Sequence, residues 1–409
     1  MDRIIRNARI GTDATRPLVD IAIADGRIAA IAPNLAADGP QHDAAGRYVS
    51  PGFVESHIHL DKSCILDRCA SERGDLQEAI GEVAKAKKGF TAEDVQTRAR
   101  RTLEKCILQG ATHMRTQLEV DPAIGLRGLD GVLPLIDEYR WAIDMEICVF
   151  PQEGLLNNPG TDDLMVEALK RGCRVVGAAP YTDSDPAGQI DRVFAMAREF
   201  DVDIDMHLDF GADPTRLDLD QVCRLTDRFG YGGRVAIGHV TKLAAASPAQ
   251  FDAAARRLAD AGVALTVLPS TDLFLMGRDH SENHPRGVTA AHRLLHAGVN
   301  CALSTNNVLN PFTPFGDCSL VRMANLYANI AHVGARSDIE ACLHMVTTRA
   351  ARLMRLDDYG LEVGKAADLV ILDHTDAAGV VAELAPPLMV FKRGRPTVTR
   401  QPATLHRPA

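Results

Sequence analysis

Eight apolar runs, each followed by a longer polar or amphipathic segment, alternate along the middle of the chain. They are, in order, GFVESHIH, HMRTQLEV, MEICVFPQ, CRVVGAAP, VDIDMHLD, RVAIGHV, ALTVLPS and NCALSTNN. Nearly continuous apolar runs are typical of parallel strands that are covered on both faces. Eight strand–helix units predict an α/β fold of the (β/α)8 TIM-barrel type, which typically needs about 250 residues. The segment 53–355 supplies that length with room for insertions.

The two ends of the chain have a different pattern. Short β-rich stretches with turn signals, among them the pair Asp25-Gly26, fill the first fifty residues, and similar stretches return near the C-terminus. We therefore expect residues 1–52 and 356–409 to pair into one small composite β-sandwich beside the barrel of residues 53–355. A chain of 409 residues suits one large barrel with such a smaller module.

Composition narrows the choice of partner and compartment. Hydrophobic residues make up 46 % of the chain, which permits a large core and argues against disorder. The formal net charge of −9 and the lack of a long basic run argue against a nucleic-acid partner. No apolar stretch reaches membrane-spanning length, and the nine cysteines form no C-x-x-C pair. We expect a cytoplasmic protein with reduced cysteines that acts on a small molecule; homo-oligomerisation stays open.

The first apolar run ends in two histidines, His57 and His59. Side chains at positions i and i+2 of a strand point the same way, so both imidazoles converge on one point, as two ligands of one metal ion would. The alternative is a pair of hydrogen-bonded core histidines. Histidines also end the fifth and sixth runs, at His207 and His239. In such barrels the catalytic groups lie at the carboxyl ends of strands, so this recurrence favours a metal site.

Taken together, these segments resemble the amidohydrolase superfamily, and within it the cytosine-deaminase-like metal-dependent hydrolases. The stretch VSPGFVESHIHLDKS resembles the first-strand motif of that family, and FPQEGLL resembles a segment typical of cytosine deaminases. VDIDMHLD and AIGHV resemble its fifth and sixth strands, and YGLEVGKAADLVILD resembles the C-terminal sandwich strand. The resemblance covers nearly the whole chain. N-isopropylammelide hydrolases share the framework and are comparably similar.

The resemblance implies roles for the residues that match the motifs of the family. His57, His59 and His207 match its metal ligands, and His239 matches a histidine that orients or deprotonates the metal-bound water. Gln152 matches the amide that hydrogen-bonds the substrate heterocycle. The implied cofactor is one divalent metal ion, zinc foremost, with iron and manganese as alternatives, since three imidazoles suit several ions.

Three positions depart from the pattern of the family. The Asp expected after the eighth strand is Asn306, the Glu expected three residues after the fifth-strand His is Phe210, and the His expected in the second-strand motif is Gln117. These departures argue against cytosine itself as the substrate. Asp209 lies two residues after His207, so strand alternation predicts that it faces the same site.

Asp209 and His239 are therefore the expected proton-transfer groups, and a structural ion pair at a strand end is the alternative for both. Asn306 is expected either to ligate the metal through its carbonyl oxygen or to form a turn. Lys62 is expected either to contact an anionic group of the substrate or to pair with a neighbouring carboxylate.

These residues predict a metal-dependent amidohydrolase that hydrolyses a C–N bond of a small N-heterocycle, with deamination by a metal-bound hydroxide as the leading form. Hydrolysis of a cyclic amide, a carbamate or an N-alkylamino group at the same site is the first alternative. A non-catalytic ligand-binding homologue is the second, because the eighth-strand Asp of the family is Asn306. A third is that Asn306 is an engineered replacement of that Asp.

Overall fold

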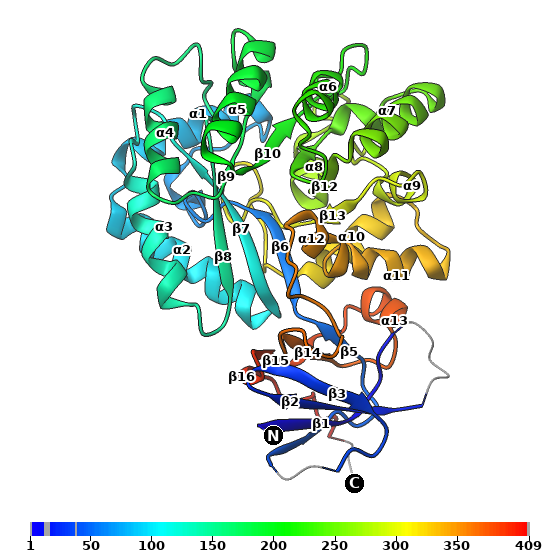
Figure 1. Cartoon of the computed structure of the whole chain (residues 1–409). Helices are drawn as coiled ribbons and strands as arrows, with labels where there is room; N and C mark the ends of the chain where they lie inside the picture. The colour runs from blue at the N-terminus through cyan, green and yellow to red at the C-terminus, as the bar shows by residue number, and fades with distance from the viewer. Residues whose placement is uncertain (1, 12–16, 37–38, 407–409) are drawn as a thin grey trace.

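The computed structural model describes residues 2–11, 17–36 and 39–406, which form a barrel with a smaller β module below it (Figure 1). Eight parallel strands make up the barrel sheet in chain order. They are β6 (Phe53–Ile58), β7 (Ala111–Glu119), β8 (Asp144–Phe150), β9 (Val175–Val176), β10 (Asp203–Leu208), β11 (Val235–His239), β12 (Ala264–Val267) and β13 (Cys301–Leu303). Each coincides with one of the eight apolar runs, so the predicted (β/α)8 barrel is confirmed.

The barrel closes where its first strand meets the end of its last. The backbone N–H of His59 donates to the carbonyl of Asn306 at 2.9 Å, and the N–H of Asn306 donates to the carbonyl of His57 at 2.9 Å. Nearer the bottom of the same junction between the first and last strands, which we call the seam, the hydroxyls of Ser56 and Ser304 share a hydrogen bond of 2.8 Å. The closing hydrogen bonds thus fix the His-x-His motif directly beside Asn306.

Helices cover the outside of the barrel, and side-chain caps start several of them. The Asp75 carboxylate accepts the Glu78 N–H at 2.8 Å, and Ser247 forms a capping box with Gln250. The helices are α1 (Leu76–Ala86), α2 (Ala92–Leu108), α3 (Arg127–Glu138), α4 (Thr161–Lys170), α5 (Pro186–Phe200), α6 (Leu219–Phe229), α7 (Pro248–Ala261), α8 (Pro269–Leu275), α9 (Ala291–His296), α10 (Leu320–Ile330), α11 (Arg336–His344) and α12 (Thr348–Leu353). Within the described ranges, none is long and apolar enough to cross a membrane.

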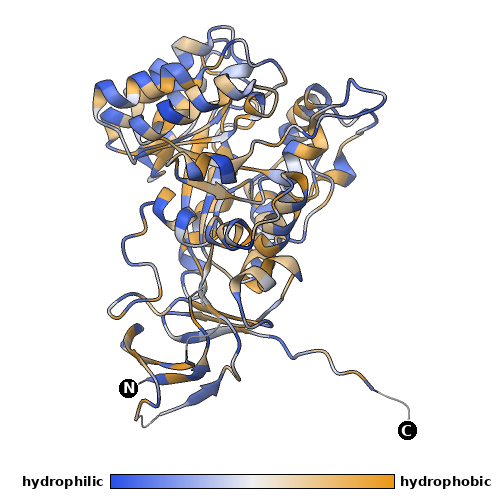
Figure 2. Cartoon of the chain, turned by 90° about the vertical axis from the view of Figure 1, so that its right-hand side faces the viewer, coloured by the Kyte–Doolittle hydropathy of each residue, from blue (hydrophilic) through white to orange (hydrophobic). Residues whose placement is uncertain are grey.

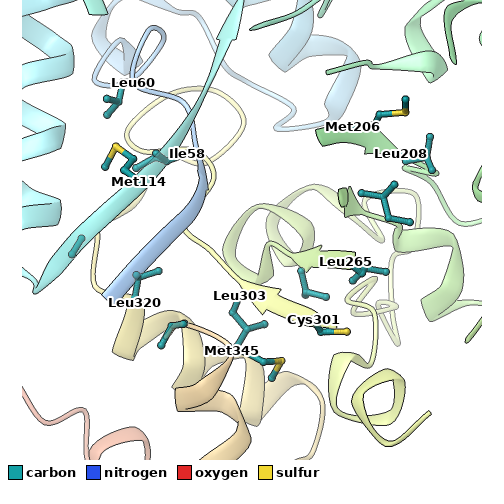
Figure 3. Close-up of a cluster of buried hydrophobic side chains, with 14 of the residues drawn as sticks. Ile58, Leu60, Met114, Met206, Leu208, Leu265, Cys301, Leu303, Leu320 and Met345 are labelled. Atoms are coloured by element: carbon teal, nitrogen blue, oxygen red, sulfur yellow. The ribbon is translucent and has the colours of Figure 1, made fainter. Parts of the chain in front are cut away.

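One large apolar core joins the strands to most of these helices, and α12 packs against the strands in a second cluster. Figure 3 shows part of the large core, with side chains from β6, β7, β10, β12, β13 and α10. The hydropathy colouring agrees with a buried apolar core, since the strands are mainly hydrophobic and the outer helices carry polar faces (Figure 2). All nine cysteines are free, and seven of them are buried. This packing holds the carboxyl ends of the strands, and the polar groups on them, in fixed positions.

The module below the barrel is built from both ends of the chain. One sheet has the order β3-β2-β1-β4, and the other has the order β16-β15-β14-β5, so a strand from the N-terminal part pairs with β14 at the edge of a sheet of three C-terminal strands. Ile21 and Phe391, one from each sheet, lie in a shared buried cluster. Asp25 and Gly26 both have positive φ and form the turn between β2 and β3. The strands are β1 (Arg3–Ala8), β2 (Val19–Ala24), β3 (Arg27–Ala32), β4 (Gln41–Asp43), β5 (Val49–Pro51), β14 (Leu369–Leu372), β15 (Pro387–Lys392) and β16 (Arg395–Thr399), with helix α13 (Ala377–Ala382) between β14 and β15.

A buried polar cluster joins this module to the bottom of the barrel. The Lys392 ammonium lies 2.7 Å from a carboxylate oxygen of both Asp144 and Asp368, and it donates to the Thr112 carbonyl at 3.0 Å. The His113 ring stands 3.6 Å from Asp368. Because the ammonium already lies between the two carboxylates, this cluster serves as a structural ion pair.

His113 is predicted to make stability depend on pH. Burial, with a contribution from Lys392, lowers its pKa from 6.5 to about 4. Between those values the unfolded chain binds more protons than the folded one, so stability is lost as the pH falls through that window, by at most about 3 kcal/mol. The variant His113→Gln cannot titrate there. Its melting temperature should fall less than that of wild type between pH 7 and pH 5, and parallel curves would contradict the assignment.

Candidate metal centre and active site

Three imidazoles converge at the carboxyl ends of β6 and β10. The Nε2 atom of His207 lies 3.2 Å from Nε2 of His57 and 3.2 Å from Nε2 of His59. All three side chains are buried. Both histidines of the His-x-His motif point into the barrel, as strand alternation predicts. The third nitrogen comes from another strand, β10.

These three nitrogens fit a shared cation. A neutral imidazole carries a single N–H, so three facing Nε2 atoms cannot all be satisfied by hydrogen bonds to one another. Burial lowers the pKa of all three rings and keeps them neutral, which is the form that ligates metals. Their separation is close to the ~3.3 Å between two nitrogens that bind a tetrahedral ion at about 2.0–2.1 Å. His57, His59 and His207 can therefore hold one divalent metal ion.

A buried carboxylate and an amide support His57 from behind. Gln117 Nε2 lies 3.3 Å from His57 Nδ1, and Asp205 Oδ1 lies 3.6 Å from the same atom. The other Asp205 oxygen accepts from Arg115 at 3.0 Å. Burial opposes ionisation of Asp205, but His57 and Arg115 hold its pKa below the usual value. Outer groups of this kind orient metal-binding histidines. The sequence signal for Asp205 was its place two residues before His207 on one strand.

His239 lies beside the three converging rings and has a carboxylate partner of its own. Its ring centre is 5.5 Å from that of His207 and 6.1 Å from that of His57. Its Nδ1 lies 2.5 Å from Oδ1 of Asp272, a fully buried residue of α8 whose other oxygen accepts the Leu268 N–H at 3.3 Å. Sequence reasoning missed Asp272, because nothing in the PSTD stretch after the seventh run points to His239.

Asp209 does not face the imidazoles. Its two oxygens accept the backbone N–H groups of Asp218 and Leu219, at 2.9 and 3.0 Å, at the start of α6, and Lys242 Nζ lies 3.3 Å away. Strand β10 ends one residue earlier, and Asp209 adopts a left-handed φ of 49°. The alternation rule therefore stops before it. The prediction that Asp209 shares the site of His207 is wrong, and its alternative, a structural ion pair at a strand end, fits.

Lys62 and Gln152 form the polar wall of a cavity beside the imidazoles. The buried Lys62 ammonium pairs with Glu119 and donates to Gln152 Oε1 at 3.3 Å. It also lies 4.2 Å from the centre of the Phe312 ring. Gln152 Nε2 is buried and has no hydrogen-bond partner. The pairing of Lys62 with a carboxylate is present, and because Lys62 also lines the cavity, its contact with an anionic group of the substrate stays a prediction.

A second buried lysine stands behind Glu119. Lys87, in the short helix η2 (Lys87–Gly89) at the end of α1, lies 3.3 Å from Glu119 and 2.6 Å from Asp121. Burial alone would raise the pKa of Glu119, but Lys62 and Lys87 hold it below its usual value, so Glu119 is ionised. The network ties α1, whose first residue Leu76 lines the cavity, to the carboxyl end of β7.

The cavity is small. Its free volume is about 10 Å³, roughly the space of one water molecule. Leu76, Phe210, Leu275 and Phe312 supply its apolar walls, and no Asp or Glu of the described chain lines it. A ring-shaped ligand therefore requires some of these walls to move.

Asn306 lines this cavity and is buried, and neither its Oδ1 nor its Nδ2 has a hydrogen-bond partner. Its φ of 65° is left-handed, it forms an isolated β-bridge with Ile58, and its amide faces the same space as His59 and His207. The choice between metal ligand and turn residue stays a prediction. An amide there can accept or donate a hydrogen bond but cannot take a proton from water.

A barrel with three convergent buried imidazoles at its strand ends, and a fourth with its own carboxylate, defines a metal-dependent hydrolase. The chain belongs to the amidohydrolase family, whose family model matches residues 42–131 and 137–398. Like its relatives, it is an enzyme that hydrolyses carbon–nitrogen bonds.

Several characterised proteins and solved structures are similar over nearly the full length. N-isopropylammelide isopropyl amidohydrolase of Pseudomonas sp. (strain ADP) is 28 % identical over 96 % of both chains, and pterin deaminase of Rhizobium rhizogenes is 27 % identical over 92 % of this chain and 87 % of that one. The crystal structure of 5-methylcytosine deaminase from Klebsiella pneumoniae liganded with 5-fluorocytosine is 29 % identical, covers 99 % of each chain and superposes with a TM-score of 0.94.

Replacing Asp209 tests its corrected role. Asp209→Asn keeps the shape but weakens the cap on α6 and the contact with Lys242, so the free energy of unfolding should fall by about 1 kcal/mol. The kcat on any substrate should stay within about threefold of wild type, because the carboxylate does not face the imidazoles. Urea unfolding and steady-state kinetics measure the two effects. A hundredfold loss of kcat in a stably folded variant would restore a proton-transfer role.

Proposed function

We propose that the protein is a zinc-dependent hydrolase that removes an amino or alkylamino group from a small, oxo-substituted N-heterocycle, with deamination as the leading form. The observation that carries this proposal is the pairing of the three-imidazole centre with an adjacent cavity whose polar wall is made of hydrogen-bond donors. Three of the similar proteins act on, or bind, rings of this kind: an alkylated triazine, a pterin and a pyrimidine.

Lys62 and Gln152 form a wall of hydrogen-bond donors, here called the donor wall, and it favours one kind of ring edge in a ligand. Because Gln152 Oε1 accepts from Lys62, the side chain of Gln152 turns its NH2 group toward the cavity, and Lys62 adds an ammonium beside it. Two adjacent donors match a carbonyl oxygen next to an unprotonated ring nitrogen. An edge that offered an N–H there would leave buried donors unpaired, at a cost of about 1–3 kcal/mol each.

The other walls suit a flat ring that lies close to the imidazoles. Phe312, Phe210 and Tyr181 bring aromatic surfaces to the cavity. Phe210 stands where the resemblance leads one to expect a glutamate, so the leaving nitrogen meets a hydrocarbon there and not a carboxylic acid. His239 is the group of the cavity lining that can exchange a proton with both the attacking water and the leaving nitrogen.

The ion that His57, His59 and His207 would hold lowers the pKa of a water molecule and so supplies a nucleophile at neutral pH. The remaining tasks belong to the chain. Lys62 and Gln152 hold the ring by its acceptor edge, Asn306 offers an uncharged hydrogen-bonding group, and the apolar walls exclude bulk water from the reacting carbon.

An amine-release screen tests the proposal. The protein loaded with zinc should release ammonia or an alkylamine from at least one aminopyrimidine, pterin or aminotriazine that carries a ring carbonyl. The nature of the amine separates deamination from N-dealkylation. A protein that binds zinc and turns over none of these rings, nor any cyclic amide or carbamate, would refute the hydrolase proposal and favour a ligand-binding homologue.

Metal content is expected to follow the three imidazoles. Wild type should bind one divalent ion per chain, and His59→Ala should lose most of it, because two nitrogen ligands hold zinc far less tightly than three. Elemental analysis after dialysis against a weak chelator measures the stoichiometry. His113→Gln, which changes a histidine at the opposite end of the barrel, is the matched control and should retain the ion. Equal metal content in wild type and His59→Ala would contradict the assignment.

The donor wall predicts the effect of removing one donor. Gln152→Leu has nearly the same size but no N–H, so kcat/KM for an oxo-substituted ring should fall by about 10- to 100-fold, the equivalent of ~1.4–2.7 kcal/mol. The loss should be smaller for an analogue that lacks the ring carbonyl. Steady-state kinetics with both substrates measure the difference. The same loss for both compounds would mean that Gln152 only shapes the cavity.

A further inference from the structure

We propose that Asp272 is the positioning residue for His239: it holds the ring so that Nδ1 carries the proton and Nε2 faces the cavity as a proton acceptor. This inference rests on the proposed function and assigns within it a role to a residue that no part of the resemblance covers.

The hydrogen bond fixes which nitrogen is protonated. Asp272 Oδ1 lies 2.5 Å from His239 Nδ1, and an ionised carboxylate only accepts, so His239 donates through Nδ1. Asp272 is held in turn by the N–H of Leu268 to its second oxygen and by its position inside α8, where it is 0 % exposed. A neutral ring that donates from Nδ1 has its lone pair on Nε2.

The backbone at the end of β11 independently points to a constrained ring. His239 has φ 70° and Val240 has φ 49°, which puts two consecutive non-glycine residues in the left-handed region. For β-branched Val240 this conformation is a genuine outlier, and such strain persists only where the surroundings impose it. They do so here, because the Val240 N–H donates to the Leu208 carbonyl at 3.1 Å, and the Thr289 hydroxyl donates to the Val240 carbonyl at 2.7 Å.

The other carboxylates near the imidazoles are engaged elsewhere. Asp205 lies behind His57 and pairs with Arg115, and Asp209 caps α6. Asn306 carries no charge. Among the described residues, Asp272 is therefore the carboxylate that is hydrogen-bonded to an imidazole of the cavity lining.

The charge of Asp272 matters in the step that His239 would perform. The water oxygen forms a bond to the ring carbon while one of its protons passes to His239 Nε2. His239 then returns that proton to the leaving nitrogen as the C–N bond breaks, so that one amine is released for each water consumed. During the interval His239 is a cation, and the adjacent Asp272 carboxylate stabilises it without accepting the proton.

The first test reads the tautomer without relying on turnover. In metal-free protein with ¹⁵N-labelled histidine, long-range ¹H–¹⁵N NMR should show His239 protonated on Nδ1, with the signal assigned by its absence in His239→Gln. In Asp272→Asn the amide can donate to Nδ1, so the Nε2-protonated form should appear. A wild-type His239 protonated on Nε2, or an unchanged tautomer in Asp272→Asn, would overturn the proposal.

The second test separates positioning from a structural role. On a substrate found in the amine-release screen, Asp272→Asn should lower kcat by about 10²-fold or more and leave KM and zinc content within about threefold of wild type. Asp272→Glu, which keeps the charge, should recover at least tenfold over Asp272→Asn. Asp209→Asn, a buried carboxylate at the neighbouring strand end, is the matched control for the loss of buried charge. A wild-type kcat in Asp272→Asn would overturn the proposal, as would equal losses in Asp272→Asn and Asp209→Asn.

The two tests also distinguish this inference from the proposed function. If wild type releases no amine from any compound, the proposed function fails. The NMR measurement still decides whether Asp272 sets the tautomer of His239.

Discussion

The closing hydrogen bonds between β6 and the end of β13 are the interaction on which the site depends. They join the backbones of His57 and His59 to that of Asn306, so the residues that first suggested a metal are held by the same bonds that make the sheet a barrel. Opening this seam would separate Asn306 from the imidazoles and leave backbone donors and acceptors of both strands unpaired in the core. The site is therefore a consequence of closure and does not form from one strand alone.

What could be predicted from the sequence, and what could not, divides at the strand ends. The alternation rule placed His57 and His207 correctly within β6 and β10, and it also held for His59, which lies one residue past the end of β6. The chain then turns through left-handed positions at Asp209, just after β10, at His239, the last residue of β11, and at Asn306, beyond β13, and there the rule no longer says where a side chain points. Asp209 was misplaced for that reason.

The ion-pair partners of buried charged side chains also could not be predicted from the sequence. Lys62 could be assigned to a substrate or to a carboxylate from the sequence, but not to Glu119, which comes from the next strand and is itself shared with Lys87. Asp272 pairs with a histidine 33 positions earlier across two barrel units. Such pairs depend on which strands are neighbours and on loop conformations, and neither is encoded in a local pattern. The fold class, the eight strands and the terminal sheets could all be predicted from the sequence, because hydrophobic periodicity and composition determine them.

The charge arrangement around the cavity also explains how a site without a lining carboxylate can be stable and still accept a ligand. Three buried carboxylates behind the lining have cationic or imidazole partners: Glu119 with Lys62 and Lys87, Asp205 with Arg115, and Asp272 with His239. The faces turned inward are imidazole nitrogens, amides and the Lys62 ammonium, so the electrostatic field in the cavity favours electron-rich atoms of a ligand. The apolar walls meanwhile leave room for about one water molecule. Since Lys87 anchors the end of α1 that is remote from Leu76 through buried ion pairs, we expect the Leu76 end of that helix to be the part of α1 that moves when a ring enters.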